Sequence, residues 1–163
     1  MEQVKKHTIS VMVENKFGVL AHISGLFSAR GFNIDSLAVG ETEDPTVSRM
    51  TIVVTGDDRT LEQVTKQLNR LVDVIRVEDL TNKGFIDREL LLFKVEVTGR
   101  NKNKVKEILK ESDAKIVDEK KSILTAQLCG NKKDIDELFK KLQMYKIKEL
   151  VRTGRIALAK EKE

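Results

Sequence analysis

Tryptophan is absent from this chain, and cysteine and proline occur once each, as Cys129 and Pro45. A single cysteine excludes an intrachain disulfide and any cysteine-rich metal site. The two histidines, His7 and His22, do not stand at a metal-ligand spacing from Cys129. We therefore expect no metal site, and we assign no metal-ligating residue.

Long apolar runs are missing as well. No stretch approaches the roughly 20 residues that a membrane-spanning helix needs, and residues 1–6 are too short and polar for a secretory signal. These absences indicate a cytoplasmic protein. Charged residues make up 34% of the 163 residues, but acids and bases are interspersed and the net charge is only +4. Such a mixture is typical of a solvated surface and does not favour nucleic-acid binding.

The hydrophobic residues that are present change their period near the start of the chain. Residues 8–13 alternate between apolar and polar positions, which predicts a half-buried strand over 7–14. After Gly18 the apolar residues recur at steps of three and four, which predicts a helix over 19–30. Gly31 stands where a helix usually ends, because glycine adopts a left-handed backbone without steric cost. A strand, a short polar loop and a helix therefore follow one another.

The same order of elements occurs twice. Further strands are expected at 33–41, 48–55 and 74–80, with a second helix capped by Asp58, and the pattern returns after a linker at 82–84. The sequence thus predicts an α+β protein of two tandem ferredoxin-like βαββαβ units, at 1–81 and 82–163. Each unit would be a four-stranded antiparallel sheet with two helices on one face. Apolar or small residues are expected on the bare sheet faces and favour a homodimer: Leu37, Val39, Ile123 and Cys129.

The loop before the first helix is the candidate ligand site. The first turn of a helix has N–H groups without partners and favours negative charge. Gly18 lacks a Cβ, so a ligand carboxylate can approach its backbone, and the amide of Asn15 can donate and accept hydrogen bonds. The same residues also fit a purely structural role, with Gly18 as a turn glycine and Asn15 as the helix cap.

Two other function classes find little support in the sequence. An RNA-recognition module reads bases with aromatic side chains on its central strands. Here aromatic residues make up only 4% of the chain, and the third strand carries Met50, Ile52 and Val54 instead. No serine has a histidine–acid partner at a sensible spacing, and no phosphate loop or dinucleotide fingerprint occurs. We assign no catalytic residue, which leaves a ligand-sensing or interaction module.

Several segments of the first half together resemble the N-terminal ACT domain of the small, regulatory subunit of acetolactate synthase (acetohydroxyacid synthase). They are residues 14–20, 25–28, 30–34 and 46–51. The second unit resembles the C-terminal domain of the same family. One departure is Phe17, where many ACT loops have proline before the glycine.

The resemblance implies a non-catalytic protein without a cofactor of its own. It would bind and activate a catalytic large subunit that carries thiamine diphosphate, Mg²⁺ and FAD. It would also confer feedback inhibition by valine or another branched-chain amino acid in valine, leucine and isoleucine biosynthesis. The alternative is an ACT-type amino-acid sensor that controls a different enzyme or a transcription regulator, although no helix-turn-helix is recognisable.

The resemblance also implies where the effector binds. In the family two ACT domains pair side by side as a homodimer, with the effector at their interface. The loop and helix start of one subunit are matched here by Asn15, Gly18, Val19 and Leu20. The strand supplied by the other subunit is matched by Asn33 and Ile34.

Overall fold

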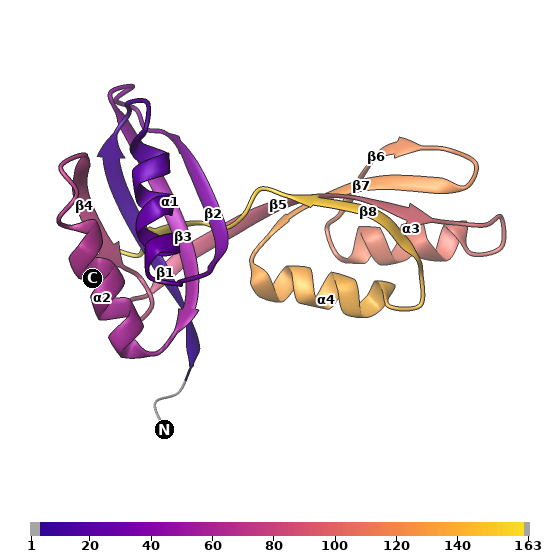
Figure 1. Cartoon of the computed structure of the whole chain (residues 1–163). Coiled ribbons are helices and arrows are strands. Elements are labelled where there is room, and N and C mark those ends of the chain that lie inside the picture. Colours follow the sequence, from indigo (N-terminus) through magenta and orange to yellow (C-terminus); the bar gives the residue numbers. More distant parts are fainter. Residues whose placement is uncertain (1–3, 162–163) are drawn as a thin grey trace. The chain divides into compact units, whose positions relative to one another are not determined.

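The structure, a computed structural model, describes residues 4–161 and divides into two compact units (Figure 1). The first unit contains the residues up to 86 together with those from 155 onward, and the second contains 87–154. The expected division into 1–81 and 82–163 differs from this packing, because the last strand returns to the first unit.

The first unit has the expected βαββαβ order. Its elements are β1 (Lys5–Glu14), α1 (Val19–Ala29), β2 (Ile34–Glu41), β3 (Val47–Gly56), α2 (Asp58–Leu68) and β4 (Val74–Asp79). The strands form a sheet in the order β2-β3-β1-β4, with antiparallel neighbours throughout. Both helices lie on one face of this sheet (Figure 1). The strand β2 is therefore one edge of the sheet, and β4 is the other.

The alternation in β1 places its apolar residues in the core of the first unit. Ile9 and Val11 are fully buried and lie opposite Ile52 and Met50 of β3. The helices cover this layer with residues such as Phe27. The expected cap of α2 is wrong by one residue. Asp57, not Asp58, accepts the hydrogen bond from the backbone N of Thr60, at 2.8 Å, so the helix begins one residue after its cap.

The second unit repeats the plan. Its elements are β5 (Phe85–Glu96), α3 (Lys102–Glu111), β6 (Lys115–Glu119), β7 (Ile123–Gly130), α4 (Lys132–Leu142) and β8 (Ile147–Arg152), with β5 beginning in the first unit. The sheet order is β6-β7-β5-β8, and α3 and α4 pack on one face of it (Figure 1). A capping box between Asn131 and Asp134 starts α4. The predicted α+β class and the repeated βαββαβ order are confirmed.

A final strand, β9 (Ile156–Ala159), pairs with β5 and covers part of the bare face of the first sheet. The hydroxyls of Ser36 and Thr51 accept hydrogen bonds from the backbone N of Arg155 (3.0 Å) and Ala157 (3.3 Å). The Arg155 guanidinium donates to Thr8 Oγ1 at 3.2 Å. The expectation that this face has no cover within the chain is wrong, because its hydroxyls supply acceptors for a returning strand.

The strand register also corrects two expected bare-face residues. Leu37 and Val39 lie opposite Ile52 and Met50, so they belong to the helix-covered face of the first sheet. In the second unit Ile123 and Cys129 alternate with the buried Leu124 and Leu128, which places them on the face away from the helices, as expected. None of the helices in the described part of the chain is long and apolar enough to cross a membrane.

Candidate functional site

The helix α1 begins without a side-chain cap. Its N-cap is Gly18, whose backbone has φ 86° and ψ −21°, a left-handed conformation that only glycine adopts readily. No acidic side chain lies in the first turn, and a Cβ built on Gly18 would meet no atom within 4 Å. Val19 is buried, whereas Leu20 is 43% exposed. The helix start is therefore open on its outer side and suited to an anion.

Asn15 does not cap this helix. Its side-chain nitrogen donates to Glu41 Oε1 at 3.1 Å and to the carbonyl oxygen of Pro45 at 2.9 Å. Its backbone N donates to the carbonyl oxygen of Thr46 at 2.7 Å. These bonds tie the loop before α1 to the β2–β3 turn. They engage both N–H groups of the Asn15 amide and leave its Oδ1 as the acceptor that can meet a ligand donor.

Asn33 and Ile34 lie at the opposite end of α1 from this loop. The helix has 11 residues, so it spans about 16 Å at 1.5 Å per residue. Asn33 is exposed, and Ile34 packs partly against the core of the first unit. One chain thus brings Asn15, Gly18 and the first turn together, but it does not bring them to Asn33 and Ile34.

The side chain of Asn33 is held by Asp35. Its Nδ2 donates to Asp35 Oδ1 at 3.0 Å, while Thr55 donates to Asp35 Oδ2 at 2.6 Å and Lys6 Nζ lies 3.3 Å from the same oxygen. The hydroxyl of Thr55, followed by Asn33 and Lys6, holds the pKa of Asp35 below its ordinary value, against the opposing effect of burial. An ionised Asp35 therefore fixes the Asn33 amide at neutral pH.

Sequence reasoning missed the two carboxylates that orient these asparagines. Glu41 lies 26 positions from Asn15, and no local pattern connects them. Asp35 lies two positions after Asn33, a spacing at which short polar side chains commonly form hydrogen bonds. This contact could therefore have been predicted from the sequence.

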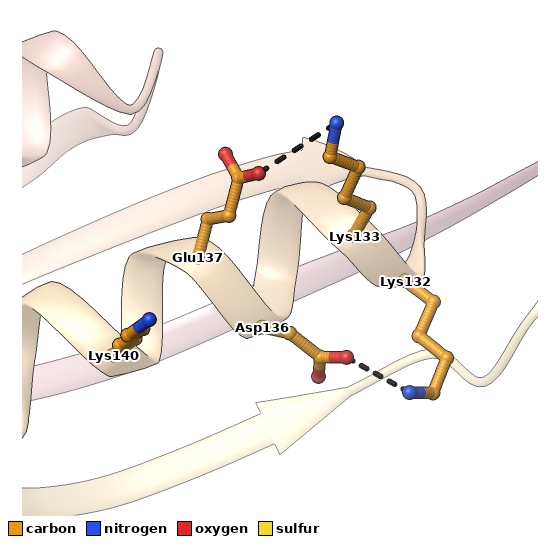
Figure 2. A pocket seen from close by; sticks show the side chains of 5 residues that line it. All are labelled: Lys132, Lys133, Asp136, Glu137 and Lys140. Carbon is orange, nitrogen blue, oxygen red and sulfur yellow. Dashed lines mark hydrogen bonds and ion pairs between the residues drawn. The ribbon is translucent and has the colours of Figure 1, made fainter.

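A separate hollow lies along the exposed face of α4 in the second unit (Figure 2). It has a volume of about 400 Å³ and is lined by Lys132, Lys133, Asp136, Glu137 and Lys140. Figure 2 shows two ion pairs across one helical turn, Lys132–Asp136 at 2.8 Å and Lys133–Glu137 at 3.8 Å. Exposed ion pairs of this kind contribute little to stability, and their side chains change conformer readily. We interpret this hollow as a solvated helix face and place the candidate site at the start of α1.

Comparison with known proteins decides the family. Residues 9–76 match the model of the AHAS small subunit-like ACT domain, and residues 88–161 match that of the small subunit of acetolactate synthase. A protein of Archaeoglobus fulgidus named probable acetolactate synthase small subunit is 44% identical over 155 residues, which cover 95% of this chain and 97% of that protein. The chain belongs to the acetolactate synthase small-subunit family.

Further comparisons agree with this assignment. The acetolactate synthase small subunit of Mycobacterium bovis is 42% identical over 156 residues, covering 96% of this chain and 93% of that protein. The crystal structure of the acetolactate synthase small subunit from Thermotoga maritima superposes with a TM-score of 0.87 at 33% identity, over 98% of this chain and 99% of that one. The resemblance seen in the sequence is confirmed, and the small subunit is the non-catalytic, regulatory subunit of acetolactate synthase.

Proposed function

We propose that this small subunit binds the catalytic large subunit of acetolactate synthase, raises its activity and makes it sensitive to feedback inhibition by valine. Thiamine diphosphate, Mg²⁺ and FAD belong to the large subunit in this proposal, and the small subunit carries none of them. The complex acts in the cytoplasm, in branched-chain amino acid biosynthesis. The observation that carries the proposal is the uncapped start of α1, open above Gly18, in a chain of this family.

The geometry of the loop fits an amino acid. The effector carboxylate meets the backbone N–H groups of Gly18, Val19 and Leu20, which favour negative charge. Its ammonium donates hydrogen bonds to oxygen atoms. Asn15 Oδ1 is one such acceptor, because the Nδ2 of the same amide already donates to Glu41 and Pro45. The exposed side chain of Leu20 offers an apolar surface for the branched side chain. The partner copy adds Asn33 as a further polar contact and Ile34 as a further apolar one.

Pairing of two copies through β2 would bring both halves of this site together. The end of β2 lies beside the loop, because Glu41 bonds Asn15. The strand is at the sheet edge, with backbone groups free to pair. In a two-fold antiparallel pair, the start of one strand lies beside the end of the other. Asn33 and Ile34 of one copy would then approach Glu41 and Asn15 of its partner.

A ligand held by two copies stabilises one arrangement of the pair over others. Such differential binding is the physical basis of allosteric control, and typical coupling free energies are about 1–3 kcal/mol. In this way the binding of valine between two copies changes the activity of the catalytic subunit, although valine does not contact its active site.

The proposal is tested with Gly18→Asp in the complex with the catalytic subunit. Aspartate tolerates the left-handed backbone better than most residues and suits a helix N-terminus, so the fold should survive. Its carboxylate occupies the place of the effector carboxylate and repels it. We expect valine inhibition to be lost while activation of the catalytic subunit is retained, measured as catalytic rate against valine concentration.

Gly18→Ala is the matched control, because it also adds a Cβ, with at least as much backbone strain as aspartate, but without the charge. We expect this variant to keep valine inhibition, with affinity weakened by at most about tenfold, since the strain is on the order of 1 kcal/mol. Full valine sensitivity of Gly18→Asp would show that the effector does not bind at this helix start.

A further inference from the structure

The face of β1 away from the helices carries a row of polar and thioether side chains, part of which β9 covers. Thr8, Ser10 and Met12 alternate with the core residues and point away from the helices. Arg155 reaches Thr8, at one end of the row. Ser10 and Met12 continue the row. Ser10 lies opposite Thr51, to which β9 bonds, and is only 5% exposed, whereas Met12 is partly buried.

Two arginines stand on either side of Met12. Met12 lies opposite Arg49 in β3 and opposite Arg76 in β4, so the three side chains share one face of the sheet. Together with Ser10 and Glu78 they line a small, partly enclosed cavity of about 40 Å³. That volume exceeds the roughly 10–15 Å³ needed by one water and is far below the ~300 Å³ of the smallest usual ligand pockets. Only the tip of a side chain or a small ion fits.

The charge in this cavity is not balanced. Arg76 lies 3.5 Å from Glu78, but Lys83 shares that carboxylate at 3.1 Å. In the described part of the chain, Arg49, a partly buried residue, has no carboxylate within ion-pair distance, and its guanidinium donates to Met12 Sδ at 3.6 Å. A thioether is a weak acceptor, whereas a guanidinium has five donors in a fork that matches a carboxylate. Arg76 and Lys83 thus share Glu78, and Arg49 is left without an acidic partner among the described residues.

We infer that a carboxylate side chain of the catalytic subunit inserts between Arg49 and Arg76 when the two subunits associate. Docking would exclude water from this face, and a desolvated guanidinium needs a charged acceptor to avoid a large penalty. The cavity admits a carboxylate and excludes bulkier groups, which gives the contact its selectivity. The inference rests on the proposed function, because it places the catalytic subunit on the open face of the first sheet.

The test measures the affinity of the purified catalytic subunit for the full-length chain. The double variant Arg49→Gln, Arg76→Gln removes both guanidinium groups, and we expect its dissociation constant to rise at least about 30-fold. The dependence of binding on salt should become shallower in the same variant. Arg59→Gln on α2 is the matched control, since Arg59 is exposed on the helical side, and its affinity should change less than about twofold. Thermal unfolding verifies that each variant folds.

A zero-length cross-link identifies the acceptor. The Arg49→Lys variant places a primary amine in the cavity, which a carbodiimide joins to a neighbouring carboxylate as an amide. We expect mass spectrometry to find an aspartate or glutamate of the catalytic subunit in the cross-linked peptide. Unchanged affinity of the double variant, or cross-links confined to the small subunit, would overturn the inference. If the wild-type chain fails to bind the catalytic subunit at all, the proposed function itself fails.

Discussion

At the scale of single residues, the side chains of the proposed effector site are fixed by partners that lie outside it. Asn15 is oriented by Glu41 and by the carbonyl oxygen of Pro45, and Asn33 is oriented by Asp35. Each asparagine thus has a defined direction before any ligand arrives, which lowers the entropy that binding must remove. In the proposed site, Glu41 and Asp35 therefore set the orientation of two residues that match the family motif.

Asp35→Asn should destabilise the first unit in a pH-dependent way. The pKa of Asp35 lies below its ordinary value of 3.8 in the folded chain, so its stabilising contribution is complete above that pH and is lost as the pH falls through the folded pKa. We expect the free energy of unfolding to drop by about 1–2 kcal/mol at pH 7, since hydrogen bonds to a charged group are lost. The difference from the wild type should shrink below pH 3.8.

Urea unfolding at pH 7 and at pH 3 measures both differences. Glu43→Gln is the control, because Glu43 is exposed in the β2–β3 turn and no change in stability is expected. A stability loss in Asp35→Asn that is equally large at both pH values would contradict a role for the ionised carboxylate.

At the scale of elements, β2 is the part of the first unit that suits self-association. It is an edge strand whose acidic residues, Asp35 and Glu41, stand near its ends, and the stretch between them carries no charge. Sheets usually protect such edges with lysine, proline or a bulge inside the strand. Here the only register shift lies between Ile34 and Ser36, at the start of β2, so the remaining edge is regular.

Val39→Lys should weaken the proposed pairing of two copies. Val39 is 49% exposed near the middle of the uncharged stretch, and a lysine there acts as the charge that native edges use to prevent pairing. Sedimentation velocity should show a shift from dimer toward monomer, together with reduced valine affinity.

The other edge of the same sheet offers the control. Ile75→Lys introduces the same charge at a comparably exposed position on β4 and should leave the assembly unchanged. If Ile75→Lys dissociated the dimer and Val39→Lys did not, the interface would lie on β4 and the proposed pairing through β2 would be wrong.

At the scale of the whole molecule, the chain leaves the first unit and returns to it. The first sheet is complete by residue 79, yet β9 lies on its bare face and buries Ala157 there. Thr8 and Thr51 are almost fully buried as a result, although they stand on the face without helices. The first unit therefore consists of two separated stretches of sequence.

Ending the chain after Gly154 should destabilise the first unit even though its sheet and helices remain. The change removes the hydrogen bonds from Arg155 and Ala157 and exposes the buried hydroxyls, and we expect a loss of about 2–3 kcal/mol. Chemical denaturation measures the loss, and amide exchange should show faster exchange in β1 and β3. A chain ended after Lys160 keeps β9 and should retain the stability. Equal stability of both truncations would show that β9 contributes nothing to the first unit.

The local pattern of the sequence determined the elements, their order and the position of the candidate site. The shift from period two to a helical period at Gly18 is a property of neighbouring residues, and it located β1 and the open helix start, where the family resemblance places four of the candidate site residues. The βαββαβ repeat followed from the same kind of signal, because each element buries one face and its apolar spacing records which one.

The tertiary structure alone decided three other features: that Asn15 bonds Glu41 rather than capping α1, that β9 returns to the first unit, and that Arg49 and Arg76 meet on one face beside Met12. Each depends on which strands are neighbours and in what register. Hydrophobic periodicity fixes the face on which a side chain lies, but strand pairing joins residues far apart in the chain, and no local pattern specifies it.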